Sequence, residues 1–439
     1  MTSETSSVSS WSYQANSGIA SVDVSADGRR VLAGTLGKRV LCLDRDGLLI
    51  WSAEVGNQAW HVALSADGQV AVGGTGSTRP WDMKGRGLYA WDVQGHARWA
   101  LDLGASVWGL ALAADGRTVV AGTSGREALL LDDAGHVLWR REIPGIGWWA
   151  WVLAAALSAD GQTVAVGTAK KSVLVLDRGG NLMGEQPTEA DVFAVAVAAD
   201  GGTVAAGSSD RQVYVLDRGG DLLWRQTLED KVWDVDLSAD GRLLVVGAGE
   251  KEAHVRTFDR GGRPLWKRYV KGSVSSVAVS AGAEVIVAGT RQGHMYLFDG
   301  QGEPLAHTVA SEIIRAVAVA DDGQTVAAAS EDGYVYGFLL PPRPRPSLSP
   351  GAGEGTGAPD PTLAPLRRLL IQRLNLQETW ACCFDLGVDF ESLGGEGKAG
   401  KLRALLAHLA QREALPRLID WLRRNRPDMD AALDEILKG

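Results

Sequence analysis

The sequence predicts an all-β, eight-bladed β-propeller followed by a small all-α domain. A strand-and-turn phrase ending in S-A-D-G or a close variant recurs eight times at a spacing of about 40 residues, and further short strand patterns follow the copies. Four short strands repeated at this period are typical of a propeller blade. Beyond residue 360 the apolar residues instead recur at intervals of three and four, which is a helical pattern.

The repeated phrase provides the first strand and the first turn of each unit. In the fourth unit a second strand pattern follows at 163–168 and a third at 172–177, and in the fifth unit a D-x-x-G turn leads into a fourth at 221–228. Asp-Gly and Gly-Gly pairs supply positive φ angles, so we expect two-residue hairpins at these joints. The eight copies are SVDVSADG (21–28), HVALSADG (61–68), GLALAADG (109–116), AAALSADG (154–161), AVAVAADG (194–201), DVDLSADG (234–241), SVAVSAGA (276–283) and AVAVADDG (316–323).

The D-x-x-G turns indicate how the ring closes. The last unit ends at 334–340 without such a turn, so its fourth strand is missing. Trp11 precedes Asp27 by the same 16 residues that separate Trp224 from Asp240. We therefore expect residues 8–15 to form the missing outer strand and to pair with the last unit, which leaves no free sheet edge. A seven-bladed ring with one stray unit is the alternative. The seven turns start at Asp44, Asp92, Asp132, Asp177, Asp217, Asp259 and Asp299.

Tryptophan stands seven residues after the aspartate of five D-x-x-G turns, and Gly184 and Ala306 take the other two places. An indole ring at this position buries a large apolar area between neighbouring blades. Together with the N-terminal tryptophan, the predicted blade-packing residues are Trp11, Trp51, Trp99, Trp139, Trp224 and Trp266.

These motifs resemble two propeller families. The S-A-D-G turn followed by V-A-x-G-T resembles WD-repeat proteins, although Trp91-Asp92 is the one literal Trp-Asp pair. The D-x-x-G-x-x-x-W element resembles the PQQ-like (quinoprotein-type) propellers, whose tryptophans dock adjacent blades. The resemblance extends over most of residues 1–340. It implies the fold and leaves the function open, because propellers host many unrelated activities.

Composition restricts the classes of function. The formal net charge is −9, and the acidic excess lies in residues 1–340, which argues against nucleic-acid binding. Three cysteines are too few for a disulfide framework and fit a reducing compartment. No secretory signal is visible, and no apolar run of about 18 residues predicts a membrane span. We therefore expect a cytoplasmic protein with neither nucleic-acid nor membrane partners.

A linker separates two predicted domains. Residues 341–360 contain six of the 15 prolines followed by a glycine-rich run, so we expect an extended and then flexible segment. The propeller accordingly spans residues 1–340, closed by its N-terminal strand, and the helical domain spans residues 361–439. One apolar helix face in that domain consists of Leu402, Leu405, Leu406 and Leu409.

The helical domain resembles the bacterial effector-associated domains, which are small death-like helical modules. The likeness extends over residues 366–427 and is strongest in CFDLGVDFESLGGEGKAGK (383–401), where Leu393-Gly394 stands at a place at which the family often has Leu-Pro. Members of this family join a sensing or scaffold domain to a separately encoded effector, such as a protease or another toxic enzyme, through contacts between like modules. The resemblance implies the same role here.

No residue pattern predicts catalysis or a metal site. The seven histidines are scattered, Cys382 and Cys383 are adjacent within a predicted helix, and the run GGEGK (394–398) lacks the spacing of a phosphate loop. The aspartates of D-x-x-G are explained by their turns without calcium. A quinone cofactor is disfavoured, because the chain shows no export signal, no adjacent cysteine pair in the propeller and no calcium-ligand set. We therefore expect no enzyme activity, no metal and no cofactor.

One position in each first strand, seven residues before the Asp-Gly turn, is rich in aromatic residues. In a propeller this position lies near the mouth of the central channel, and aromatic residues and Arg are enriched at interaction hot spots. The loop before the fourth unit adds three tryptophans. The alternative is that these rings cap the apolar layer between blades. The predicted ligand- or partner-binding rim is Trp60, Trp108, Trp148, Trp149, Trp151, Phe193, Trp233 and Arg315.

Taken together, the sequence predicts a non-enzymatic adaptor or sensor of a bacterial conflict or immune signalling system. The propeller would bind an unknown protein or small ligand, and the helical domain would recruit an effector that carries a matching helical module. Two other hypotheses stay open: a quinone- or metal-dependent propeller enzyme, and a passive scaffold for large assemblies.

Overall fold

The computed structural model describes residues 8–77, 84–144, 151–250 and 253–342, and in the C-terminal region residues 366, 369–370, 373–374, 378–379, 382–383, 386, 388, 401–402, 405–406, 409, 415–430, 433–434 and 436. The chain divides into two compact units, one that contains the strands and one that contains the described C-terminal residues. Most of the predicted linker lies outside the described residues.

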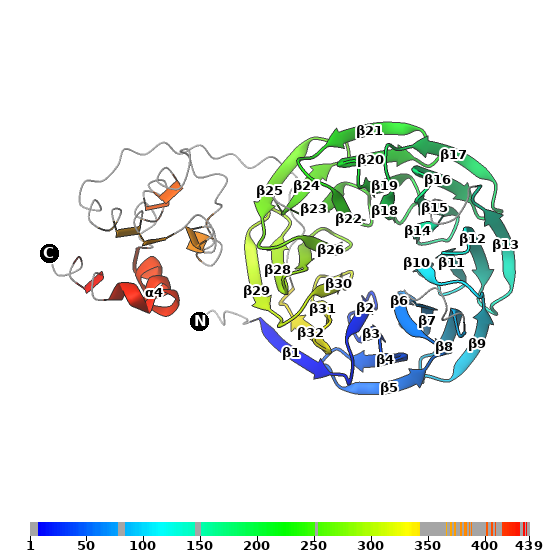
Figure 1. Cartoon of the computed structure of the whole chain (residues 1–439), viewed down its shortest axis with the longest axis horizontal. Coiled ribbons are helices and arrows are strands. Elements are labelled where there is room, and N and C mark those ends of the chain that lie inside the picture. The colour runs from blue at the N-terminus through cyan, green and yellow to red at the C-terminus, as the bar shows by residue number, and fades with distance from the viewer. Residues whose placement is uncertain are drawn as a thin grey trace. The chain divides into compact units, whose positions relative to one another are not determined.

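The strands form eight four-stranded antiparallel sheets arranged in a ring (Figure 1). Each innermost strand lies beside the innermost strands of both neighbouring blades, so the ring is continuous. The eight-bladed prediction is confirmed, and the seven-bladed alternative is wrong. From blade 1 to blade 8 the innermost strands are β2 Ile19–Val24, β6 Gln58–Leu64, β10 Val107–Leu112, β14 Val152–Leu157, β18 Val192–Val197, β22 Val232–Leu237, β26 Val274–Val279 and β30 Ile314–Val319.

Three further strands extend each blade outward from the axis. The second strands are β3 Arg30–Thr35, β7 Val70–Gly76, β11 Thr118–Thr123, β15 Thr163–Thr168, β19 Thr203–Ser208, β23 Leu243–Ala248, β27 Val285–Thr290 and β31 Thr325–Ser330. The third strands are β4 Arg39–Asp44, β8 Gly87–Asp92, β12 Glu127–Asp132, β16 Ser172–Asp177, β20 Gln212–Asp217, β24 His254–Asp259, β28 His294–Asp299 and β32 Tyr334–Leu339. The outermost strands are β5 Leu49–Glu54, β9 Ala97–Asp102, β13 Val137–Glu142, β17 Leu182–Pro187, β21 Leu222–Thr227, β25 Pro264–Tyr269, β29 Pro304–Val309 and, in blade 8, β1 Ser9–Gln14.

Blade 8 closes the ring with strands from both ends of the propeller sequence. Strand β1 pairs with β32, and Trp11 stands opposite Gly337 in the register. The predicted N-terminal outer strand is therefore confirmed. The ring of Trp11 lies so close to Gly337 and to Gly47 of blade 1 that a β-carbon at either glycine would collide with it.

The S-A-D-G turns join all eight blades through their backbones. The amide of Ala26 donates to the carbonyl of Ala66 at 2.9 Å, and the same bond recurs from blade to blade until the amide of Asp321 donates to the carbonyl of Ala26 at 3.2 Å. Eight such bonds make a closed circle. We call this end of the ring the turn face; because successive strands are antiparallel, the D-x-x-G turns lie at the same end. The opposite end, where the innermost strands begin, is the rim face.

The hairpin turns are longer than the two-residue type that the sequence led us to expect. The amide of Asp44 donates to the carbonyl of Leu48 at 2.9 Å, so the D-x-x-G loop has three residues, with Gly47 at φ 83°. A three-residue loop that ends in a left-handed residue is the bulge type of hairpin. Oδ1 of Asp44 accepts the amides of Asp46 and Leu48, so the aspartate stabilises the turn itself.

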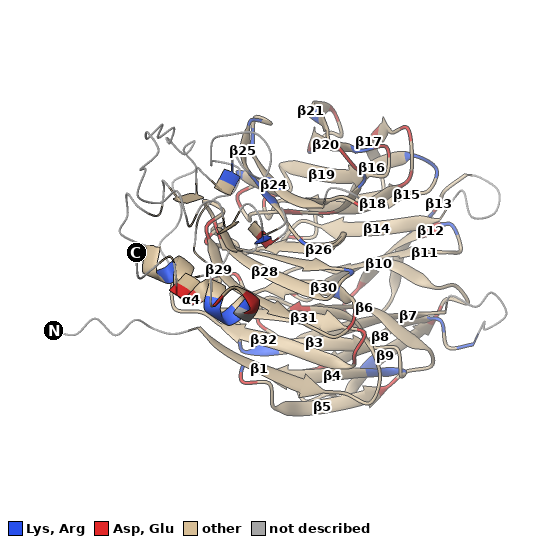
Figure 2. Ribbon diagram, turned by 60° about the vertical axis from the view of Figure 1, so that its left-hand side comes forward, with Lys and Arg blue, Asp and Glu red and all other residues tan. Residues whose placement is uncertain are grey.

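The second strands are the most deeply buried part of the ring. Every residue of β15 (TVAVGT) and β19 (TVAAGS) is buried, and the side chains are small where the blades crowd together. The outermost strands instead alternate between half-buried and exposed residues, as β13 does. Lys, Arg, Asp and Glu accordingly gather at the turns and on the outer strands (Figure 2).

The C-terminal unit contains one helix that is described along its whole length. Helix α4 runs from Leu415 to Asn425 and is followed by the 3-10 turn η3, Pro427–Met429. The helix buries Leu418, Trp421 and Leu422 on one face, as an amphipathic helix does when it packs on a core. The helical prediction is confirmed for this segment.

The buried residues of the C-terminal unit form one apolar core. Cys382 and Cys383 belong to it and are buried. No helix in the described part of the chain is long and apolar enough to cross a membrane. The leucines predicted to share a helix face all lie in this core, namely Leu402, Leu405, Leu406 and Leu409.

Candidate axial binding site

The predicted rim position is a β-bulge in every blade. In each innermost strand the register with the second strand shifts at this residue, for example at Trp108, between Val107 and Gly109. A bulge redirects the side chain of its extra residue out of the regular alternation of the strand. The eight bulge residues, which we call the axial rim, are Ala20, Trp60, Trp108, Leu153, Phe193, Trp233, Ser275 and Arg315.

Four predicted rim residues form a continuous chain of contacts from blade 8 to blade 4. The guanidinium of Arg315 lies over the ring of Trp60 at 5.2 Å, which is a cation–π distance, and it also pairs with Glu331. Trp60 contacts Trp108 with ring centroids 5.9 Å apart, and Trp108 stacks on Trp151 at 6.0 Å. Because the rim residue of blade 1 is an alanine, Arg315 reaches past that blade.

A second group of rim contacts lies on blades 5 to 7. Phe193 stacks on Trp233 with ring centroids 5.1 Å apart and an interplanar angle of 14°. The guanidinium of Arg291 lies 4.8 Å from the centre of the Trp233 ring, and the ammonium of Lys231 lies 5.7 Å from it. These rings are half-buried rather than enclosed. The structure thus brings the predicted residues together in two groups, while their role in binding stays a prediction.

Three aspartates that the sequence analysis missed lie on the innermost strands beside the rim. Asp23 on β2 and Asp234 and Asp236 on β22 are half-buried, and each links its strand to the next blade. Oδ2 of Asp23 accepts the amide of Leu64 at 2.7 Å, and Oδ2 of Asp236 accepts the amide of Val279 at 2.8 Å. We call these three residues the axial carboxylates.

The axial carboxylates have raised pKa values because burial removes water from their charged form. Burial raises the pKa of Asp23 and of Asp234 to about 6 and that of Asp236 to about 7. The negative charge of Asp23 in blade 1 also raises the pKa of Asp236 in blade 6. Residues three blades apart therefore act on each other across the axis of the ring.

A signal for these aspartates was present in the repeats. Two positions of each repeat lie six and four residues before the Asp of the Asp-Gly turn. These positions are occupied by Ala, Gly or Ser in most repeats, and the exceptions are His61, Asp23, Asp234 and Asp236. A charged residue at a position that is otherwise small is the signal that an alignment of the units would show. Two predicted rim residues, Trp148 and Trp149, lie outside the described residues.

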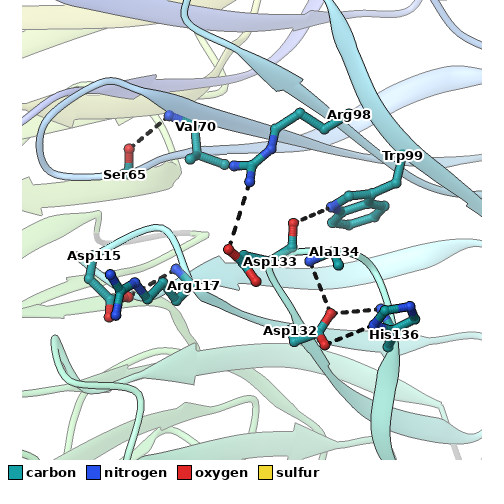
Figure 3. A network of polar contacts seen from close by, with 10 residues as sticks. All are labelled: Ser65, Val70, Arg98, Trp99, Asp115, Arg117, Asp132, Asp133, Ala134 and His136. Atoms are coloured by element: carbon teal, nitrogen blue, oxygen red, sulfur yellow. Dashed lines mark hydrogen bonds and ion pairs between the residues drawn. The ribbon is translucent and has the colours of Figure 1, made fainter.

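The six predicted blade-packing tryptophans lie at the turn face. Figure 3 shows the pattern at Trp99, whose indole N–H donates to the carbonyl of Asp133 in the next blade at 3.0 Å. In that D-x-x-G turn, Oδ1 of Asp132 accepts the amides of Ala134 and His136. The indoles of Trp51, Trp139, Trp224 and Trp266 make the equivalent bond, at 2.9–3.2 Å.

One pair of histidines that are distant in sequence meets in blade 7. Nδ1 of His294 lies 3.0 Å from Nε2 of His307, and the two rings are stacked. Burial lowers the pKa of both to about 4, so both are neutral at pH 7. In the regions that the structure describes, no group of three His, Cys, Asp or Glu residues is arranged to hold a metal ion.

Comparisons with known proteins give two family matches. Residues 4–145, 39–193 and 169–338 match the family model described as outer membrane protein assembly factor BamB, which is a PQQ-like model, and residues 366–427 match effector-associated domain 7. The predicted resemblances to the PQQ-like propellers and to the effector-associated domains are thereby confirmed, and the resemblance to WD-repeat proteins stays a prediction. The chain is also similar to the crystal structure of the computationally designed Ika8 protein, with 19% sequence identity, a TM-score of 0.62 and coverage of 74% of this chain and 98% of that one. This likeness shows the fold alone. No curated protein sequence matches the chain.

Proposed function

The chain belongs to the family described as outer membrane protein assembly factor BamB, and we propose that this propeller, joined to an effector-associated domain, is a non-enzymatic adaptor of a bacterial effector system. The propeller recognises a partner at the axial rim. The C-terminal domain recruits an effector protein through contacts with a matching helical module. In this proposal the chain works in the cytoplasm and signals the presence of the partner to the effector.

The observation that supports this proposal most directly is the match of residues 366–427 to an effector-associated domain. Such a domain implies association with effector proteins, and here it stands on the same chain as a closed ring with a concentrated aromatic rim. Assembly of outer-membrane proteins is the role that the family description names, and it belongs to the relative after which the family is called.

The enzyme and scaffold hypotheses require different properties of this protein. An enzyme needs an acid, base or nucleophile in contact with a substrate. Each axial carboxylate instead accepts two backbone amides, as Asp236 does from Leu237 and Val279. These bonds favour a structural and electrostatic role for the carboxylates. A scaffold would need the C-terminal domain for self-association alone.

The proposal is tested by co-purification. The full chain and a chain that ends at Leu340, where the last blade is complete, are expressed with each neighbouring gene product that contains an effector-associated domain. We expect the full chain to retain one such protein and the shortened chain to lose it. Equal retention by both chains, or by neither, contradicts the recruitment. Light scattering of both chains identifies the scaffold, because a scaffold forms large assemblies only when the C-terminal domain is present.

A further inference from the structure

We propose that the rim face binds a basic segment of a partner protein, with a lysine or arginine side chain entering between the rim residues toward the axial carboxylates. This inference rests on the proposed function, which makes the axial rim the site of recognition. It adds the chemical class of the occupant.

The first support is charge complementarity. Asp23, Asp234 and Asp236 accept backbone amides, but no Lys, Arg or His side chain in the described part of the ring bonds to them. The side-chain charges that act on the pKa values of Asp23 and Asp236 are all negative. Partly desolvated carboxylates without a counter-ion favour a cation, because electrostatic interactions strengthen as water is excluded. The acidic net charge of residues 1–340 attracts the same ligands over a longer range.

The second support is the aromatic character of the rim. Two of its rings already hold cations of this chain, Arg315 over Trp60 and Arg291 over Trp233, so their faces accept a guanidinium group. Trp108 and Phe193 have no cation over their rings in the described residues. A partner's basic side chain therefore finds rings of the same kind beside the carboxylates.

The third support is the extent of the rim. Its side-chain contacts run from Arg315 of blade 8 through Trp60 and Trp108 to Trp151, and again from Phe193 to Trp233 on blades 5 and 6. A metal cation or a small amine would contact only part of this rim. A peptide segment with a basic side chain is long enough to contact both groups of rings, so we assign the occupant as a peptide.

The placement of these groups sets the direction of approach. Trp233, Asp234 and Asp236 follow one another along β22, so the distance from the rim to the deepest carboxylate is about 10 Å at the rise of a β-strand. The closed circle of turn-face hydrogen bonds lies at the far end of the same strands. We therefore assign the approach to the rim face.

An acidic partner is the competing occupant, because the rim face also has cations. Lys38, Lys171 and Arg211 stand at the tips of the hairpins between second and third strands, and all three are exposed. Exposed charges in water contribute little to binding energy compared with desolvated ones. The observations therefore favour a basic occupant, and the acidic one becomes an outcome of the test.

The test measures binding of two matched sets of fluorescein-labelled nonapeptides to the full chain by anisotropy at low ionic strength. Each set has uncharged residues around a fixed centre, which is Arg or Lys in the first set and Glu in the second. We expect the basic set to bind and Asp234→Asn/Asp236→Asn to weaken that binding about tenfold or more, as expected for charge-assisted hydrogen bonds. The matched control Asp221→Asn removes one charge from an exposed turn of the neighbouring blade and should leave binding within about twofold of wild type.

Other outcomes also decide the matter. If the double variant does not fold, Trp108→Leu keeps every charge and should still weaken binding of the basic set. Tighter binding of the Glu set, or no binding of either set, overturns the basic occupant. Neither result affects effector capture by the C-terminal domain, so the failure of this inference is distinct from the failure of the proposed function.

Discussion

The turn face and the rim face of the propeller consist of the same strands, yet they differ in what the repeats keep constant. At the turn face every blade makes the same backbone bond to the next blade, and five tryptophans donate to the same carbonyl position. At the rim face every blade has the same bulge, but the side chain at it varies from Ala20 to Trp60 to Arg315. The contacts that hold the ring together are therefore the same in each blade at the turn face, whereas the blades differ from one another at the rim face.

The largest predicted effect compares a tryptophan from each face. Trp99→Ala removes a ring that packs against Gly135 of the next blade and a hydrogen bond to that blade, so we expect a loss of about 3 kcal/mol of unfolding free energy. Trp108→Ala removes a half-buried ring whose indole N–H has no acceptor, and we expect about 1 kcal/mol. Urea unfolding followed by tryptophan fluorescence measures both. Equal losses would mean that the rim also holds the ring together.

The second prediction concerns pH. The pKa of Asp236 is about 7 in the folded ring, above its ordinary value of 3.8, so the folded state binds the proton more tightly. The contribution of Asp236 protonation to the unfolding free energy therefore increases as the pH falls from 8 toward 5.5, and this contribution is lost as the pH rises through 7. We expect the unfolding free energy of the wild type to gain about 1–2 kcal/mol more than that of Asp236→Asn over this interval. Thermal unfolding at the two pH values provides the measurement.

Asp236 is a clean case for this test because its surroundings contain few other ionisable groups. Strands β18 (VFAVAV) and β26 (VSSVAV), which flank β22, and β23 (LLVVGA) contain none. The remaining groups are Asp234 on the same strand and Asp23 across the axis. A matched Asp240→Asn variant, which changes an exposed turn-face aspartate, should keep the wild-type slope, and a parallel loss of slope in both variants would refute the assignment.

The contrast between the faces also explains what the sequence predicted and what it did not. The blade number, the closing strand and the packing tryptophans follow from turn-face chemistry, which repeats at fixed spacing. The axial carboxylates were missed because Asp23 and Asp234 occur within apolar strand patterns, and a strand pattern does not show which side chains face the axis. That depends on the bulge, whose position is set by pairing with the second strand. The three-residue loops were missed because Asp-Gly pairs fit several hairpin types.

The smallest predicted effect concerns a basic residue in a strained position on the rim face. Lys171 has a φ of 65°, in the left-handed region that costs an L-residue roughly 1–2 kcal/mol, whereas Gly293 occupies the corresponding turn in blade 7. Lys171→Gly relieves that strain and loses part of the gain to the greater entropy of glycine in the unfolded chain, so we expect a net stabilisation of about 0.5 kcal/mol. Lys170→Gly removes the same charge next to it without a positive φ to relieve, and it should not stabilise the ring. Denaturation midpoints of the two variants separate strain from charge: a gain in both would mean that charge repulsion, and not the backbone, opposes folding at this tip.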